Sequence, residues 1–430
     1  MALEVVEICA GAGGQALGLH RAGFVHRLAF ELDPNACETL RMNARAGRVT
    51  VSDPDLAANG NWVVPGDVAD PQNWHPEDFR GIDLLAGGVP CPPFTVAGKQ
   101  LGATDERDLF AWAVTQVKTV RPRALLLENV RGLSMPRFAG YRQHVLDQLR
   151  SFGYAAEWRL LHASDYGVPQ LRPRFVLIAM APEDFAYFHW PEPTGPAPTV
   201  GDTLKDLLGK RGWKDVGAWT EKADKIAPTI VGGSKKHGGA DLGPSRAKRA
   251  WKEMGVDALG LANDDDIPDQ DAKYEIGPKL TCEMVARLQG WDDKEFSWEF
   301  FGRKTTKYRQ IGNAFPPPVA KALGKAIAAA LSHEGEPREQ DLDTEHDPIY
   351  RALQTNGGFM TAAQIARTTK LALEPHELER RISLLGRDFH IEIRNGKAPA
   401  AYKLGEFKAF LGQESHARHE QFQQLKSKIS

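Results

Sequence analysis

Short apolar segments recur along the first part of the sequence, and each is followed at once by glycines or by acidic or amide side chains. Segments at residues 3–9, 25–32, 82–86 and 124–127 have the length and continuous apolar character of strands buried on both faces. Helical spacing, as in residues 15–22, occurs between them. This alternation predicts an α/β fold with a Rossmann-like, doubly wound and mostly parallel sheet. Ligands of such sheets bind beyond the carboxyl ends of the strands, where the polar groups of this chain lie.

The remaining chain shows changes of character that predict domain boundaries. A further strand is expected before Gly66, and residues 154–161 and 174–180 are expected to add a hairpin to the same sheet. Pro, Gly, Lys and Trp then become frequent, which predicts an inserted, loop-rich domain before helices resume. The predicted parts are a first catalytic part at 1–181, an insert at 182–278, a returning catalytic part at 279–332, a linker at 333–347, and an accessory domain with a tail at 348–430.

The accessory segment has the pattern of a small winged-helix-like unit. Three helix-like segments precede two short strands that flank an Asn-Gly turn, and this turn is typical of a hairpin. Such a unit could add a DNA contact, regulate the enzyme, or dock a partner protein. The segments are residues 349–353, 362–366 and 376–385 for the helices, and 389–393 and 401–404 for the strands.

Bulk properties exclude several classes of protein. The formal net charge of −2 gives no argument for or against nucleic acid, so any phosphate-binding surface must come from local clustering. No stretch approaches the ~20 apolar residues of a membrane span, and no leader peptide is recognisable. The four cysteines include no CxxC pair, which argues against a zinc site, and no other metal site is expected. Scattered cysteines without a leader favour a reducing, cytoplasmic location.

A glycine-rich turn after the first strand is the first candidate site. The turn at residues 10–14 would let a ligand approach the backbone, although such turns often serve only to reverse the chain. Glu31, after the second strand, could accept both hydroxyls of a ribose, and Asp67 could accept from an adenine amino group. Each acid alone could be a solvated strand end. The turn lacks the GxGxxG spacing of dinucleotide binders, which favours S-adenosyl-L-methionine over NAD.

Cys91 is the candidate nucleophile. A lone cysteine is more often a buried small hydrophobe, but Pro90 and Pro92 argue against burial in a strand and would fix the direction of the thiol. At the end of the next strand, Glu128 could face the same cleft and protonate a ring nitrogen, or it could merely cap a helix. Arg172 and Arg174, at i and i+2, could clamp an oxygen or form a surface ion pair.

The order of these pieces resembles the cytosine-5 DNA methyltransferase family over about residues 4–331. The matching segments are Glu7 to Gly14, Gly88 to Cys91, Glu128-Asn129-Val130, Gln170 to Arg174, Leu280 to Glu283 with Arg287 to Gly290, and Gln310 to Pro316. The chain departs from the family pattern at Cys9, where phenylalanine is usual, and at Pro92, where glutamine is usual.

The resemblance implies a mechanism on a cytosine flipped out of double-stranded DNA. Cys91 adds to C6 of the ring, Glu128 donates to N3, Arg172 and Arg174 hold the base, and C5 receives the methyl group of S-adenosyl-L-methionine, leaving S-adenosyl-L-homocysteine. The residues that the resemblance and the strand ends assign to the cofactor are Cys9, Ala10, Gly11, Gly13, Gly14, Glu31, Leu32, Asp67, Val68, Pro90, Leu109, Asn313 and Ala314.

The insert matches the target recognition domain of the family in position. Candidate DNA contacts in it are Thr229, Ile230, Lys235, Lys236, Arg246 and Arg249, any of which could instead be a solubilising side chain. The resemblance implies the modification enzyme of a restriction-modification system, expected to be a monomer with a possible cognate endonuclease. The alternatives are an RNA cytosine-5 methyltransferase acting on tRNA, a non-catalytic DNA-binding regulator, and a Rossmann oxidoreductase.

Overall fold

The computed structural model describes residues 2–89, 107–232, 241–292, 294–339, 347–394 and 399–407. Contacts within the chain divide it into two compact units. The first comprises Met1–Val89, Val120–Asn129 and Trp158–Glu339, and the second comprises Pro90–Thr119, Val130–Glu157 and Gln340–Ser430.

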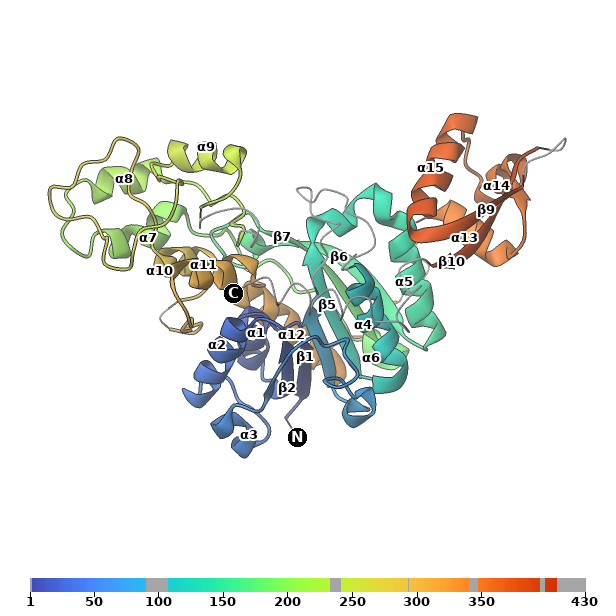
Figure 1. Cartoon of the computed structure of the whole chain (residues 1–430), viewed down its shortest axis with the longest axis horizontal. Helices are drawn as coiled ribbons and strands as arrows, with labels where there is room; N and C mark the ends of the chain where they lie inside the picture. Colours follow the sequence, from blue (N-terminus) through green and yellow to red (C-terminus); the bar gives the residue numbers. More distant parts are fainter. Residues whose placement is uncertain are drawn as a thin grey trace, which may run out of the picture. The chain divides into compact units, whose positions relative to one another are not determined.

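A seven-stranded sheet forms the centre of the catalytic fold (Figure 1). Its order is β3-β2-β1-β4-β5-β7-β6. Strand β1 pairs in parallel with β2 and β4, β2 pairs in parallel with β3, and β4 pairs in parallel with β5. This confirms the predicted Rossmann-like α/β fold, with β7 and β6 as the predicted addition to the same sheet. The strands are β1 (Glu4–Ile8), β2 (Val25–Glu31), β3 (Val63–Pro65), β4 (Leu84–Gly88), β5 (Ala124–Val130), β6 (Ala155–His162) and β7 (Pro173–Met180).

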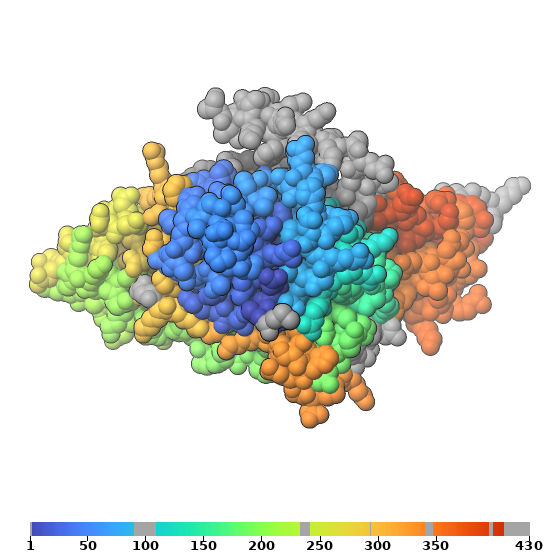
Figure 2. All heavy atoms as spheres, turned by 90° about the horizontal axis from the view of Figure 1, so that it is seen from below, coloured from blue at the N-terminus to red at the C-terminus, as the bar shows by residue number. Residues whose placement is uncertain are grey.

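Helices flank these strands and fill the insert. Those of the first unit are α1 (Gly14–Arg21), α2 (Pro34–Arg45), α3 (Pro54–Asn59), α6 (Pro182–Phe185), α7 (Val200–Leu208), α8 (Val216–Lys222), α9 (Ser245–Glu253), α10 (Cys282–Leu288), α11 (Lys304–Asn313) and α12 (Pro317–Leu331). In the space-filling view of Figure 2 the N-terminal residues (blue) and the lighter blue residues that follow them form one continuous surface.

The first helix packs unusually closely on the last helix of the catalytic fold. A Cβ on Gly18 of α1 would lie 2.4 Å from the Cβ of Ala320 in α12, and a Cβ on Gly324 of α12 would lie 2.7 Å from the Cβ of Ala22. Glycine at both places lets the two helix backbones approach each other. The contact brings the residues before α12 next to the turn that begins α1.

The insert contains short helices and, among its described residues, no strand of the sheet. Its buried Trp213, Trp219 and Trp251 share a hydrophobic cluster with Met284 of α10 and Ile311 of α11. The loop-rich insert is thus anchored on the returning helices. The helices predicted near 280–289 and 319–331 correspond to α10 and α12, whereas α11 was not predicted.

The second unit contains α4 (Arg107–Val120), α5 (Ala139–Ser151) and the C-terminal elements. The latter are α13 (Pro348–Asn356), β8 (Met360–Thr361), α14 (Ala362–Thr369), α15 (Pro375–Asp388), β9 (Phe389–Arg394) and β10 (Ala401–Phe407). The three strands form a separate sheet in the order β8-β10-β9. The predicted three helices and two-stranded hairpin correspond to α13, α14, α15, β9 and β10, whereas β8 was not predicted. No helix of the described residues is long and apolar enough to cross a membrane.

Candidate active site

The carboxyl ends of the central strands lie in register at one edge of the sheet. Ile8 at the end of β1 is paired with Phe30 and Gly87, and Gly88 at the end of β4 is paired with Glu128. The parallel direction of these strands therefore places the glycine turn, Glu31, Gly88 and Glu128 on the same side. This is the edge where ligands of doubly wound sheets bind.

The glycines of the turn at residues 10–14 have different surroundings. The backbone is left-handed at Cys9 (φ 52°), Gly11 (φ 57°) and Gly13 (φ 89°). A Cβ on Gly14 would lie 2.2 Å from the carbonyl oxygen of Phe315, and one on Gly13 would lie 2.4 Å from the ring of Trp298. A Cβ on Gly11 would meet no atom of the described residues within 4 Å. Gly13 and Gly14, predicted as cofactor residues, are therefore required for packing, whereas Gly11 leaves open space at the strand end.

Trp298 is a residue of this turn that the sequence reasoning missed. Its indole Nε1 donates a hydrogen bond to the carbonyl oxygen of Ala12 (2.8 Å), and the ring covers Gly13. The contact spans 286 positions of the chain, so no local pattern could have signalled it. The tryptophan fixes the turn from the returning part of the catalytic fold.

Glu31 is held in a defined orientation at the end of β2. Its Oε2 accepts from the backbone N–H of Gly11 (2.7 Å), and its Oε1 accepts from the N–H of Asp33 (2.7 Å). Burial raises the pKa of Glu31, and the two backbone amides oppose that rise. Leu32 beside it is 49% exposed, which provides an apolar surface next to the oriented carboxyl. An oriented carboxylate, an apolar side chain and an open glycine fit the ribose and the flat base of an adenosine group.

The other predicted cofactor residues lie in several surroundings. Asp67 Oδ1 accepts from the N–H of Ala69 (2.9 Å), so this acid also orders its own turn. The side chain of Val68 is buried, which leaves only its backbone for a ligand. Asn313 is exposed at the end of α11, and the following residue, Ala314, is next to Gly14. Leu109 is buried in α4 of the second unit.

Glu128 and Arg174 form a buried ion pair at the same edge. Arg174 Nε lies 3.4 Å from Glu128 Oε2, and both side chains are about nine-tenths buried. Glu128 Oε2 accepts no hydrogen bond from the part of the chain that the structure describes. Burial raises the pKa of Glu128, while the charges of Arg174 and Arg172 act in the opposite direction. A carboxyl group whose pKa is raised by burial holds its proton more tightly and is suited to donate it to a ring nitrogen.

The neighbouring backbone is arranged around this carboxyl group. A Cβ on Gly88 would lie 3.1 Å from Glu128 Oε1, so the glycine leaves room for the carboxyl. Asn129 is buried, and its side-chain amide donates to the carbonyl oxygen of Val89 (3.0 Å). The amide thus fixes the chain two residues before Cys91. This role of Asn129 was not predicted, because it depends on a contact with the end of another strand.

Arg172 has a different position from Arg174. Its guanidinium is buried, and it donates to the carbonyl oxygens of Ile230 (2.7 Å), Gly312 (2.7 Å) and Ala314 (2.8 Å). These carbonyls belong to the insert and to the end of α11. Charge-assisted bonds of this length are strong in a buried setting. In this structure the two Nη groups of Arg172 tie the insert to the segment before α12, whereas its Nε donates to no acceptor among the described residues.

Two glutamines complete this buried network. Gln170 Oε1 accepts from the N–H of Ile230 (2.9 Å), and Gln170 Nε2 donates to the side-chain oxygen of Gln289. Gln289 Nε2 in turn donates to the carbonyl oxygens of Ile311 and Ala314, both at 3.0 Å. Gln289 therefore positions the segment at the end of α11, a role that was not predicted from the sequence.

The predicted DNA contacts divide into supporting and exposed residues. The side chain of Ile230 is completely buried and anchors the insert, which leaves only its backbone for the predicted DNA contact. Thr229, partly exposed, donates its hydroxyl to the carbonyl oxygen of Leu171. Arg246 and Arg249 are exposed on α9, opposite buried Trp251. The predicted residues Pro90, Cys91, Lys235 and Lys236 lie outside the described residues.

Comparison with known proteins decides the family. The model of C-5 cytosine-specific DNA methylases matches residues 3–329. The chain belongs to the C-5 cytosine-specific DNA methylases. This confirms the predicted activity, S-adenosylmethionine-dependent methylation of cytosine C5 in DNA, and it rules out the oxidoreductase alternative.

Named relatives of this methylase agree with the family. It is 63% identical over 428 residues to the Type II methyltransferase M.NaeI of Lentzea aerocolonigenes, covering 100% of this chain and 99% of the relative. It is 47% identical over 340 residues to M.NgoMIV of Neisseria gonorrhoeae, covering 78% of this chain and 100% of that relative. The fold resembles that of DNMT2 of Spodoptera frugiperda, with a TM-score of 0.50, 16% identity, and coverage of 76% of this chain and 100% of the other.

Proposed function

We propose that the methylase acts on a specific double-stranded DNA sequence through a covalent bond between Cys91 and C6 of a flipped cytosine. The observation that carries the proposal is the buried Glu128–Arg174 pair, placed beside the strand end that leads into Cys91. Glu128 Oε2 lies beside Arg174 and accepts no hydrogen bond from the described residues, and burial raises the pKa of the carboxyl, which a proton donor to cytosine N3 requires.

The states of the other described cysteines support Cys91 as the nucleophile. Cys37 is buried, and burial raises the pKa of its thiol to about 12. Cys282 is also buried, with its pKa raised to about 11. Neither thiol forms the reactive thiolate near neutral pH. Cys9 lies in the glycine turn at the end of β1, on the predicted cofactor side of the strand edge.

The proposed steps use the chain's own groups. The Cys91 sulfur forms a bond to C6 while Glu128 gives its proton to N3, which leaves C5 electron-rich. Arg174, next to Glu128, would hold the base and the carboxyl in place, whereas Arg172 positions the segments around them. When bound, S-adenosyl-L-methionine supplies the methyl group that C5 receives. Loss of the C5 proton to a base from solvent then re-forms the C5–C6 double bond and releases Cys91 as a thiolate, and N3 returns its proton to Glu128.

The residues present fit the cofactor at the ends of β1 and β2. Gly11 leaves open space, Glu31 presents an oriented carboxyl, and Leu32 presents an exposed apolar side chain. We propose that these residues hold the adenosine part. Asp67 and the backbone of Val68 are proposed to complete that side, with Asn313 and Ala314 at the methionine end.

The finer biological setting is also proposed. Arg246 and Arg249 on α9, with Thr229, are proposed to contact the DNA target from the insert. The names of M.NaeI and M.NgoMIV as Type II methyltransferases support a role in a restriction-modification system. We propose a monomer that acts in the bacterial cytoplasm on the chromosome, with a cognate endonuclease as its biological counterpart.

Bisulfite sequencing of host DNA tests this function. The chain would be expressed in a host without cytosine methylases, with Cys91→Ser as the matched control. Protected cytosines at one recurring sequence, present only with the unchanged chain, are expected. Uniform conversion of DNA cytosines, or protection found only in host tRNA, would overturn the proposal.

A further inference from the structure

The C-terminal elements are built as a helix-turn-helix with a wing. In chain order they are α13, β8, α14, α15, β9 and β10, drawn in orange and red in Figure 1. The turn between α14 and α15 begins at Lys370, whose backbone is left-handed (φ 56°). Buried Ile365 of α14 and Leu378 and Ile382 of α15 supply apolar side chains for the core of the unit. In a helix-turn-helix, the second helix enters the major groove of DNA. That helix here is α15.

One face of α15 is used for packing inside this unit. Leu378, Ile382 and Leu385 are buried, with the i, i+4, i+7 spacing of a single helix face. A Cβ on Gly140 of α5 would lie 2.3 Å from Leu385, so α15 also packs closely on α5. This packing fixes which side of α15 is turned outward.

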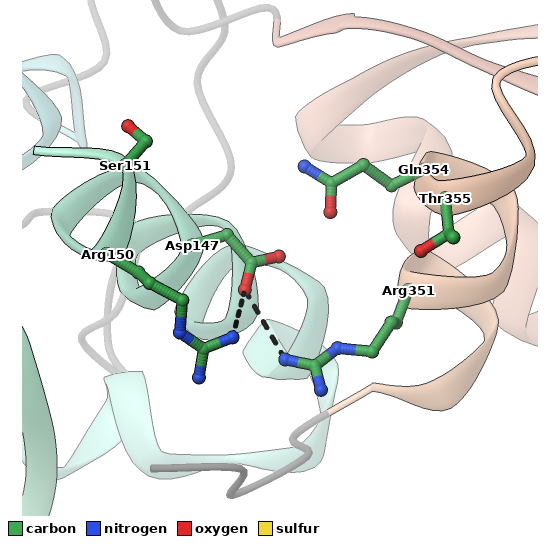
Figure 3. Close-up of a pocket in the computed structure, with 6 residues that line it drawn as sticks. All are labelled: Asp147, Arg150, Ser151, Arg351, Gln354 and Thr355. Atoms are coloured by element: carbon green, nitrogen blue, oxygen red, sulfur yellow. Dashed lines mark hydrogen bonds and ion pairs between the residues drawn. The ribbon is translucent and has the colours of Figure 1, made fainter.

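The first helix of the unit is held on α5 as well. The Tyr350 hydroxyl lies 3.1 Å from Nδ1 of His144, and Arg351 Nη2 lies 3.5 Å from Asp147 Oδ1. Figure 3 shows Asp147 between Arg150 and Arg351, with interactions to both. The arginines at this junction are thus engaged with a carboxylate, and the junction is not an anion site. The basic groups of α15 differ in this respect.

The outward face of α15 carries a basic and polar stripe. His376, Arg380, Ser383 and Arg387 follow each other at intervals of four, three and four residues, and all of them are exposed. They lie on the side of the helix opposite the leucines. Among the described residues, neither Arg380 nor Arg387 forms a salt bridge in the structure.

The acidic residues of α15 lie off this stripe. Glu377 takes part in a capping box with Glu374 and is turned to the N-terminus of its own helix. Glu379 lies at one edge of the stripe, and Asp388 is buried. The stripe therefore presents positive charge and hydrogen-bond donors to whatever approaches α15.

We propose that the stripe of His376, Arg380, Ser383 and Arg387 binds the major groove of double-stranded DNA, as a contact additional to the target recognition insert. The α15 helix has 14 residues, a length of about 21 Å, and the major groove of about 12 Å width admits a helix. Arginine recognises both phosphates and guanine edges through paired donors. The proposal does not depend on methyl transfer.

The test uses the full chain and a fluorescent 30-base-pair duplex that contains only A·T pairs, so that no target cytosine is present. Binding anisotropy is measured between 50 and 200 mM salt. The double variant Arg380→Ala/Arg387→Ala should bind at least tenfold more weakly, and its salt slope should fall by about 1.8, since each lost phosphate contact removes about 0.9. Arg381→Ala, an exposed arginine of the same helix outside the stripe, should bind within twofold of the unchanged chain.

Two further variants and readouts keep the outcome decisive. The double variant Arg380→Lys/Arg387→Lys should restore the salt slope, because it keeps both charges. Unchanged turnover of the alanine variant at saturating DNA would separate this contact from methyl transfer and show that the chain is folded. Equal binding by the alanine variant and the unchanged chain would overturn the proposal. An equal loss of DNA affinity in Arg381→Ala would also overturn it. So would the finding that the stripe binds an acidic protein but no DNA duplex.

Discussion

The two arginines of the Gln-x-Arg-x-Arg segment should fail in different ways when each is replaced by methionine. Arg172 donates to three buried carbonyls, and only that of Ala314 has a second donor, Gln289, among the described residues. Removing the guanidinium leaves the carbonyls of Ile230 and Gly312 without this partner. Each unpaired buried carbonyl costs about 1–3 kcal/mol. Part of this cost is offset because the variant no longer buries a charged guanidinium. Arg172→Met should therefore lower the free energy of unfolding by about 2–4 kcal/mol.

Arg174→Met should cost less stability and more activity. Arg174 donates to the carbonyl of adjacent Pro173 and pairs with Glu128 at 3.4 Å. Glu128 can take up a proton when its partner is lost, because burial already raises its pKa. Because a protonated Glu128 leaves no unpaired buried charge, we expect a smaller loss of unfolding free energy than for Arg172→Met, with turnover reduced about 100-fold.

Urea unfolding followed by tryptophan fluorescence compares the two variants at one pH. The unfolding midpoint of Arg172→Met should fall clearly below that of Arg174→Met. Turnover at 15 °C, where both are folded, should show the reverse order of damage. Equal midpoints, or a more stable Arg172→Met protein, would refute the assignment of Arg172 to positioning.

Three further perturbations follow from the site and the second unit. Gly14→Ala should prevent stable folding, because its Cβ would lie 2.2 Å from the Phe315 carbonyl oxygen. Gly11→Ala should lower the free energy of unfolding by about 1–2 kcal/mol, because residue 11 has a left-handed backbone, and it should weaken S-adenosyl-L-methionine binding in calorimetry. Tight binding by a folded Gly11→Ala protein would contradict this. Glu128→Gln should lower turnover at least 100-fold. In a pH–rate profile, turnover of the unchanged enzyme should fall as the pH rises through the raised pKa of Glu128, and the variant should lack this fall. Burial lowers the pKa of His144 from 6.5 to about 4, with nearby Asp147 acting in the opposite direction, so the folded state takes up a proton less readily than the unfolded state. The contribution of neutral His144 to the free energy of unfolding should therefore be fully present above pH 6.5 and be lost, by about 3 kcal/mol, as the pH falls toward 4. His144→Leu should flatten this pH dependence in urea titrations.

The sequence predicted the parts of the site that follow from local order. Buried parallel strands are short and continuously apolar, so the sequence assigns the residues at their carboxyl ends, such as Glu31 and Glu128, to one edge of the sheet. The winged-helix pattern was recognised for the same reason, since helix spacing and an Asn-Gly turn are local signals.

The parts that could not be predicted depend on contacts between distant segments. Arg172 bonds Gly312 across 140 positions, and Trp298 bonds Ala12 across 286, so neither partner has a local signature. The burial of the Ile230 side chain depends on the core of the insert, which no local pattern indicates. Helix α11 was missed because it is polar and continues into a proline-rich segment.

The central claim is that Cys91 forms a covalent bond to cytosine with Glu128 as the proton donor. The most direct measurement is trapping on duplex DNA in which 5-fluorocytosine replaces the target base, followed by intact mass spectrometry of the protein–DNA adduct in the presence of S-adenosyl-L-methionine. The C5 fluorine cannot leave as a proton does, so the adduct should persist with the unchanged chain, form much more slowly with Glu128→Gln, and be absent with Cys91→Ser. An adduct of equal yield with Cys91→Ser, or one mapped by peptide digestion to Cys9, would contradict the account.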